Sequence, residues 1–235
     1  LRVSPNSTDR SMGKLVSMAS DLLQPRDGTP PLLATPAEFE AAADLLADGS
    51  GPFAIDTERA SGFRYDDRAF LIQIRRRGAG TLLFDPESFR PELSQALAPV
   101  LNGQDWIIHA AATDLPSLAW LDLHPGTIFD TELAGRLAGF EHVNLAAMVE
   151  HIFDLHLLKG HGAEDWSQRP LPDGWLNYAA LDVEMLLELA EVMAEILDNQ
   201  DKLIWAEQEF DHILSQFAEV SEPPTPTWTN LKGIG

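Results

Sequence analysis

The apolar positions of the chain recur with two different periods, and each period predicts a type of element. Residues 39, 42, 43 and 46 are apolar and recur at helical spacing. The letters "TPAE" at 35–38 form a capping box with proline at the first helical position, and Gly49 follows the apolar stretch. The pattern predicts a helix that begins after Thr35 and ends at Gly49.

Short apolar runs then predict strands at 53–56, 69–75 and 81–84, separated by turn-rich stretches that contain Gly62, Gly78 and Gly80. The order continues with a short helix over about 91–101, a strand at 106–109, a helix at 115–121 and a strand at 127–129. Beyond Asp130 the pattern is helical, with main helices expected at 144–151, 174–198 and 200–217. Strands mixed with helices, followed by helices alone, indicate an α/β fold with a central sheet covered on both faces.

The two ends of the chain have a different composition. Residues 1–34 show no sustained periodicity, and we interpret them as a peripheral N-terminal extension. The stretch "SEPPTPT" at 221–227 has the composition of a linker. A chain of 235 residues has room for one domain, large enough to be a catalytic domain, between these two end segments.

The charge limits the ways in which such a protein can bind nucleic acid. With 16 Lys and Arg against 37 Asp and Glu, the net charge is −21, which argues against a surface that holds nucleic acid by bulk attraction. The absence of cysteine excludes disulfides, thiolate metal sites and cysteine nucleophiles. No apolar run is long enough to span a bilayer and residues 1–20 lack a secretory signal, so we expect a soluble cytoplasmic protein without a membrane partner. The sequence carries no signal for an oligomeric state.

Two carboxylates stand at the end of the first predicted strand. Asp56 and Glu58 are two residues apart, so strand alternation places them on one face while Ile55 and Thr57 point the other way. Two converging carboxylates favour a bound cation. The alternative is a solvated strand end, where acidic residues are common.

Further acidic residues follow where an α/β fold brings segments together. Asp114 begins the segment "DLPSL", and its alternative role is that of a helix N-cap. Tyr178 and Asp182 are four apart in "NYAALDVEMLLELA", so both lie on the same side of a helix. Asp182 is in the middle of an apolar helix, where an unpaired buried carboxylate is costly and a cation shared with Asp56 and Glu58 removes that cost. An amphipathic helix edge is the alternative.

These segments together resemble ribonuclease D and the wider DEDDy group of 3′-5′ exonucleases. "FAIDTE" resembles the first motif of the group and "HAAATDL" the second. "TIFDTELAGRLAG" resembles the stretch between motifs, and "DWSQRPLPDGWLNYAALDVEMLLEL" resembles the third motif with its Tyr-x-x-x-Asp. The resemblance covers about residues 35 to 215, and one departure is Ala110, where many relatives carry asparagine.

The resemblance implies a ribonuclease H-like fold, a mixed sheet flanked by helices on both faces, and a site for two divalent cations, Mg²⁺ or Mn²⁺. It assigns the metal-ligand role to Asp56, Glu58, Asp114 and Asp182, and it places Tyr178 beside the attacking water. Lys159 and Arg169 resemble family positions that touch the terminal nucleotides, with packing at a helix start as the alternative for both.

The function implied is a 3′-5′ exoribonuclease that shortens single-stranded RNA 3′ ends, as in RNA or tRNA processing. A DNA-directed 3′-5′ exonuclease uses the same site and is the first alternative. A non-catalytic module that binds nucleic acid or acts as a scaffold is the second. We expect the exonuclease domain at 35–217. At 218–235 we expect a linker and the opening turn of a C-terminal helical HRDC domain, which the chain is too short to contain.

Overall fold

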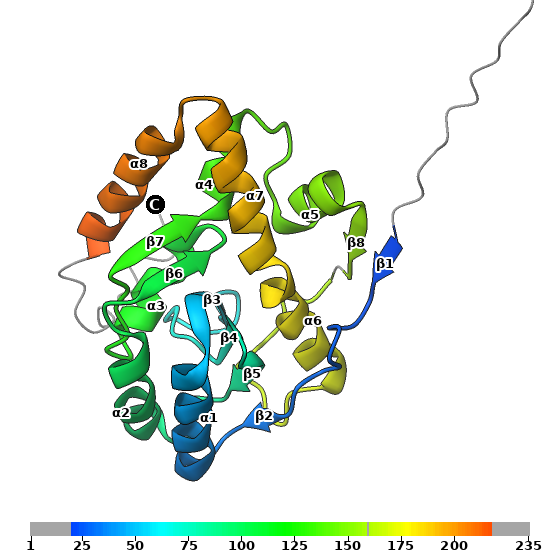
Figure 1. Ribbon diagram of the computed structural model, residues 1–235. Helices are drawn as coiled ribbons and strands as arrows, with labels where there is room; N and C mark the ends of the chain where they lie inside the picture. The colour runs from blue at the N-terminus through cyan, green and yellow to red at the C-terminus, as the bar shows by residue number, and fades with distance from the viewer. Residues whose placement is uncertain (1–19, 159, 218–235) are drawn as a thin grey trace, which may run out of the picture.

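The computed structural model describes residues 20–158 and 160–217, in which a six-stranded mixed sheet lies among helices (Figure 1). The sheet order is β2-β5-β4-β3-β6-β7. β4 pairs antiparallel with β3 and β5, whereas β6 is parallel to β3 and β7, and β2 is parallel to β5. The strands are β2 (Leu32–Leu33), β3 (Ser50–Glu58), β4 (Leu71–Arg77), β5 (Gly80–Phe84), β6 (Asp105–Ile108) and β7 (Thr127–Asp130).

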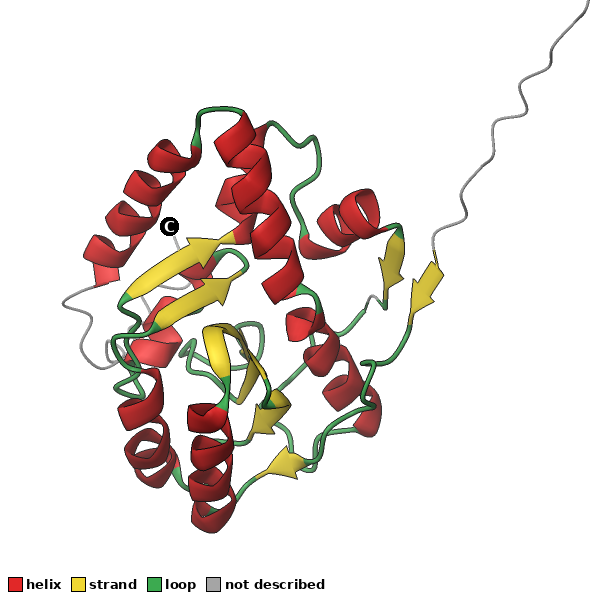
Figure 2. Ribbon diagram, in the orientation of Figure 1, coloured by secondary structure: helices red, strands yellow, loops and turns green. Residues whose placement is uncertain are grey.

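Helices cover both faces of this sheet (Figure 2). They are α1 (Pro36–Asp48), α2 (Arg90–Leu101), α3 (Leu115–Ala119), α4 (Thr131–Ala138), α5 (Leu145–Phe153), α6 (Asp173–Glu184), α7 (Leu186–Asn199) and α8 (Leu203–Phe217). Strand alternation separates the faces: Phe84 of β5 meets Phe39 of α1, whereas the preceding Leu83 packs with Ala179 and Ala180 of α6. The predicted α/β architecture is confirmed.

The first predicted helix and its cap are confirmed. The Thr35 hydroxyl oxygen accepts a hydrogen bond from the Glu38 backbone N–H at 3.4 Å, and Glu38 Oε2 accepts one from the Thr35 backbone N–H at 2.9 Å. This reciprocal pair satisfies two N–H groups that the start of a helix otherwise leaves free. The helix buries the expected apolar face against the core, including Phe39 and Leu46.

The prediction of one helix over 174–198 was wrong in one respect. The helix is broken at Met185, whose backbone has φ −108° and ψ 0°, so that α6 ends at Glu184 and α7 begins at Leu186. α6 packs on β3, β4 and β5, whereas α7 packs on β3, β6 and α4. Because a sheet twists, one straight helix cannot follow both regions, and apolar periodicity does not show such a break.

Three short strands were not predicted. β1 (Ser20–Leu22) pairs in parallel with β8 (Leu155–Leu157), and β2 joins the edge of the main sheet. Two of them lie in residues 20–34, where we expected no regular element, and β8 interrupts a region expected to be helical throughout. Segments of two or three residues are too short for alternation to be visible. Among the described residues, no helix is long and apolar enough to cross a membrane.

Candidate active site

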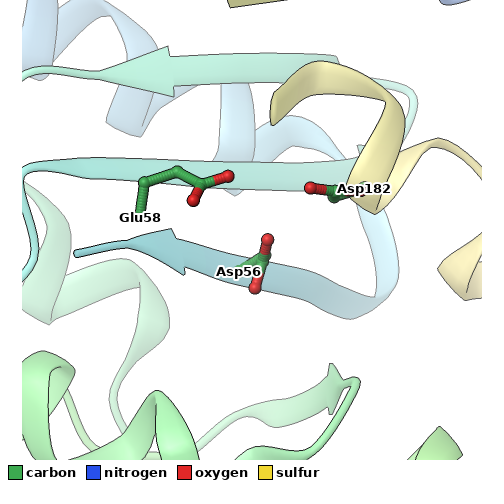
Figure 3. A group of neighbouring side chains, drawn as sticks. All are labelled: Asp56, Glu58 and Asp182. Atoms are coloured by element: carbon green, nitrogen blue, oxygen red, sulfur yellow. The ribbon is translucent and has the colours of Figure 1, made fainter. Parts of the chain in front are cut away.

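Three carboxylates from two elements meet on the α6 side of the sheet (Figure 3). Asp56 and Glu58 alternate along the end of β3, and Asp182 comes from the last part of α6, which packs across β3. One carboxylate oxygen from each residue lies within 4.8 Å of the others. The predicted convergence of these three side chains is therefore what the structure shows.

The electrostatics of this group are unfavourable without a positive charge. Burial is the main cause that raises the pKa of Asp56 and Glu58 well above the usual values, and the neighbouring carboxylates raise both further. Burial also raises the pKa of Asp182, to about 7. Within residues 20–158 and 160–217, no arginine or lysine forms an ion pair with any of the three. Such a group of close carboxylate oxygens fits a hard divalent cation, which takes oxygen ligands.

Gln73 supports Glu58 from the adjacent strand. It lies directly opposite Asp56 in the β3–β4 register, is fully buried, and its Nε2 donates to Glu58 Oε1 at 3.2 Å. This hydrogen bond fixes one oxygen of Glu58 relative to Asp56. Our sequence reasoning missed Gln73, although a lone amide inside the apolar run "AFLIQI" was a usable signal.

Asp114 is near this group and is bound differently. Its side chain accepts hydrogen bonds from Thr57 at 2.6 Å, from Thr113 at 3.0 Å and from Arg59 at 2.6 Å. Thr57 lies between Asp56 and Glu58 on the strand and points to the opposite sheet face, and Asp114 is not among the three residues whose oxygens lie within 4.8 Å of one another. It is still close enough for its charge to raise the pKa of Asp56. Asp114 occupies the N-cap position of α3, as its alternative role predicted, but its side chain makes no capping hydrogen bond.

The backbone before Asp114 is fixed by another carboxylate. Ala110 has φ 61° and ψ 54°, a left-handed conformation that asparagine adopts more readily than alanine. This conformation gives a physical reason why asparagine would suit the position that Ala110 occupies. Asp130 holds the turn, because its two oxygens accept from the backbone N–H groups of Ala110 and Ala111 at 3.1 and 2.9 Å.

Tyr178 lies one turn before Asp182 on α6 and is hydrogen-bonded to its side chain. Burial, followed by the charges of Asp182, Glu58 and Asp56, raises the pKa of the Tyr178 hydroxyl above its ordinary value. The phenol is therefore protonated at neutral pH and acts as a hydrogen-bond donor. Its ring packs edge to face with His161 at 5.7 Å between centroids, and a β-carbon at Gly162 would lie 3.3 Å from its hydroxyl oxygen.

Of the two residues expected to contact the terminal nucleotides, the structure describes only one. Lys159 lies outside the described residues. Arg169 pairs with Asp85, with Nε to Oδ2 at 2.6 Å and Nη2 to Oδ1 at 2.7 Å, and its other donors reach backbone oxygens of Phe70, Trp166 and Gln168. All five N–H groups of this guanidinium are thus engaged within the chain, although its contact with a nucleotide stays a prediction.

The family model that describes a 3′-5′ exonuclease matches residues 32–198. Among curated proteins, the chain is 30% identical over 202 residues to ribonuclease D from Jannaschia sp. (strain CCS1), covering 82% of this chain and 52% of that protein. It is 29% identical to ribonuclease D from Gluconacetobacter diazotrophicus, covering 77% of this chain and 47% of that protein. The chain therefore spans about half the length of the curated relatives that it matches.

Solved structures give a consistent result. A protein from Bifidobacterium adolescentis superposes with a TM-score of 0.81 at 39% identity, covering 92% of this chain and 52% of that chain. The catalytic core of RRP6 from Trypanosoma brucei superposes with a TM-score of 0.67 at 25% identity, covering 79% of this chain and 52% of that chain. The shared fold includes the strands and helices that carry the three-carboxylate group.

Proposed function

The chain belongs to the 3′-5′ exonuclease family of the ribonuclease D type, and on that basis we propose that it removes nucleotides one at a time from the 3′ end of RNA. The observation that carries the proposal is the convergence of Asp56, Glu58 and Asp182, with oxygens within 4.8 Å of one another and no ion-paired cation among the described side chains. Such a site has a reason to be retained only if a cation completes it.

The ligand roles follow from where each side chain lies. Asp56, Glu58 and Asp182 would hold divalent cations, two Mg²⁺ or Mn²⁺ in our proposal, and Asp114 would complete the set after exchanging part of its contact with Arg59. When bound, such ions would supply the activation of a water and the stabilisation of the leaving oxygen of a phosphodiester. Gln73 keeps Glu58 in place, since it occupies one of the two carboxylate oxygens.

Tyr178 has a separate role in this proposal. In the absence of a cation, the raised pKa keeps the phenol protonated, so it can orient the attacking water by hydrogen bonding. Its hydrogen bond to Asp182 couples this orientation to the ligand position on the same helix turn. Packing against His161 restricts the rotation of the ring.

RNA rather than DNA is proposed as the substrate. The support is the relatives named ribonuclease D. The net charge of −21 argues against broad attraction to a polyanion, so a single-stranded 3′ end would be held by contacts close to the site. The 2′-hydroxyl is the group that distinguishes RNA from DNA in such contacts.

The test uses RNA and DNA oligomers of the same sequence, labelled at the 5′ or the 3′ end, with Mg²⁺, Mn²⁺ or EDTA. We expect a ladder of shortened 5′-labelled RNA that EDTA abolishes, and slower cleavage of the DNA. Asp182→Asn is expected to remove the activity, whereas Asp173→Asn, at the exposed first position of the same helix, is the matched control. Faster cleavage of DNA would favour the DNA-directed alternative. Binding without cleavage under any metal would favour the non-catalytic module.

A further inference from the structure

A segment before the family domain contacts the helix that carries Tyr178 and Asp182. We call residues 20–34 the N-terminal strap; the family model begins only at residue 32. Its first part, β1, pairs with β8, and its last part, β2, pairs with β5. Between these two anchors the dark-blue chain passes beside α6 (Figure 1).

A tight turn fixes the middle of the strap. The Gly28 N–H donates to the Pro25 carbonyl oxygen at 2.9 Å, and Gly28 has φ +81°, a conformation that favours glycine. Pro25 is buried whereas Arg26, Asp27 and Gly28 are exposed, so the turn is anchored to the protein at Pro25. This arrangement presents Arg26 to the C-terminal end of α6.

Arg26 contacts that end through both its backbone and its side chain. The Arg26 backbone N–H donates to Glu184 Oε1 at 3.4 Å, and Arg26 Nε lies 3.8 Å from the same oxygen. Arg26 Nη2 is 3.1 Å from Met185 Sδ, and Nη1 is 3.9 Å from Glu188 of α7. The strap therefore contacts the break between α6 and α7, which follows Asp182 along the chain.

The strap also holds the other end of the functional turn. Asn177 Nδ2 donates to the Leu23 carbonyl oxygen at 2.8 Å, and the Thr29 hydroxyl donates to Asn177 Oδ1 at 2.8 Å. Asn177 immediately precedes Tyr178 and thus ties the start of that turn to two points of the strap. The contacts at residues 177 and 184–185 bracket Tyr178 and Asp182.

We propose that the N-terminal strap is a positioning segment for the active site, and that Arg26 and Thr29 set the position of Asp182 and Tyr178 through α6. The inference rests on the proposed function of these two residues. α6 is a short helix, which has little stability of its own, and its sheet side is packed through Ala179 and Ala180. The strap adds a restraint at both ends of the turn that carries Tyr178 and Asp182, and the rate of a reaction of this kind is sensitive to displacements of about 1 Å.

The test uses the double variant Arg26→Ala/Thr29→Val, which loosens the strap without altering α6. The matched control is Arg136→Ala/Thr127→Val, which removes an exposed arginine pair with Glu132 and an exposed hydroxyl bond to Asp105. We expect the strap variant to bind Mn²⁺ more weakly in calorimetry by up to about tenfold, the lower end of the cost of losing an outer partner of a metal ligand. Hydrogen exchange of the α6 amides is expected to be faster in the metal-free strap variant, and both effects are expected to be absent in the control.

Equal losses of thermal stability in the two double variants, with Mn²⁺ affinity and α6 exchange unchanged in both, would overturn the proposal. If the strap double variant does not fold, Thr29→Val alone gives the same comparison against Thr127→Val, and Arg26→Lys is expected to restore most of the Mn²⁺ affinity lost in Arg26→Ala. Failure of the proposed function is distinguishable, because the parent protein would then cleave no RNA whatever the strap variants show.

Discussion

Two acidic residues near the end of α6 have opposite surroundings. Glu184 is 1% exposed, and its carboxylate lies 3.1 Å from Arg75 and 3.8 Å from Arg26. Asp182 is only two residues earlier and faces Asp56 and Glu58 with no arginine or lysine paired to it among the described residues. The carboxylate of Glu184 is therefore paired with arginines, whereas the carboxylate of Asp182 on the same helix lies among other carboxylates.

The difference separates an acid that serves the fold from one that we propose binds a cation. Where a buried carboxylate serves the fold, this chain supplies a partner, as with Asp85 and Arg169 or with Asp130 and its four backbone donors. Where three carboxylates meet and no arginine or lysine among the described residues pairs with any of them, we propose that a bound cation supplies the positive charge. Replacing the acid by its amide at Asp182 and at Glu184 tests this distinction.

The largest expected effect is that of Asp182→Asn on cleavage. Losing one ligand charge should lower the rate by at least ~10²–10³-fold, the scale observed on removing a preorganised electrostatic group. Because the defect is in metal binding, raising Mn²⁺ should restore part of the activity. Cleavage of a labelled RNA across a Mn²⁺ titration measures both, and near-parental cleavage at low Mn²⁺ would contradict the assignment.

Tyr178→Phe sharpens the comparison within one helix turn. The substitution keeps the ring and its contact with His161 and removes only the hydroxyl. We expect the catalytic rate to fall by ~10²–10³-fold, as on removing one preorganised hydrogen-bond donor, while Mn²⁺ affinity changes little. Excess Mn²⁺ should then restore nothing. If this variant cleaves like the parent, the tyrosine only packs, and another group orients the water.

Glu184→Gln should show the reverse pattern. Removing its charge leaves Arg75, which is only 14% exposed, without a full partner, so we expect a loss of stability of about 3 kcal/mol, the lower end for a broken buried pair. The amide still accepts the hydrogen bond from the Arg26 backbone, so most cleavage at saturating Mn²⁺ should persist. Denaturant unfolding beside the cleavage assay measures the two effects. Lost cleavage with unchanged stability would reverse the roles of the two acids.

A smaller effect is expected in the pH dependence of the metal-free protein. The folded-state pKa of Asp182 is about 7, above its unfolded value, so the stability that its protonation contributes is complete at low pH and is lost as the pH rises through 7. Asparagine does not titrate. In EDTA, the thermal midpoint of Asp182→Asn relative to the parent should therefore rise between about pH 4 and about pH 8. A constant difference over that range would show that Asp182 is not perturbed.

Much of the architecture was predictable because it rests on long or strongly marked patterns. The capping box at Thr35 and the alternation that brings Asp56 and Glu58 to one face are local features, and both are confirmed. The four-residue spacing of Tyr178 and Asp182 is equally local, and the structure brings these two side chains together.

The parts that were missed depend on contacts between distant segments. Arg59 reaches Asp114 across 55 positions, and Asn177 reaches Leu23 across 154, so no local pattern carries either contact. Gln73 is meaningful only in the register of β3 and β4. The break at Met185 follows from the surfaces on which α6 and α7 pack, which periodicity does not contain.

The central claim is that Asp56, Glu58 and Asp182 form a cation site, and calorimetric titration of Mn²⁺ tests it most directly. At about pH 6.5 a carboxyl with a pKa of about 7 is largely protonated, so binding should release protons and the heat should differ between buffers of different ionisation enthalpy. We predict this proton release in the parent and in Glu184→Gln, and a loss of tight binding in Asp182→Asn. Equal Mn²⁺ affinity in Asp182→Asn and the parent, with no dependence on the buffer, would contradict the account.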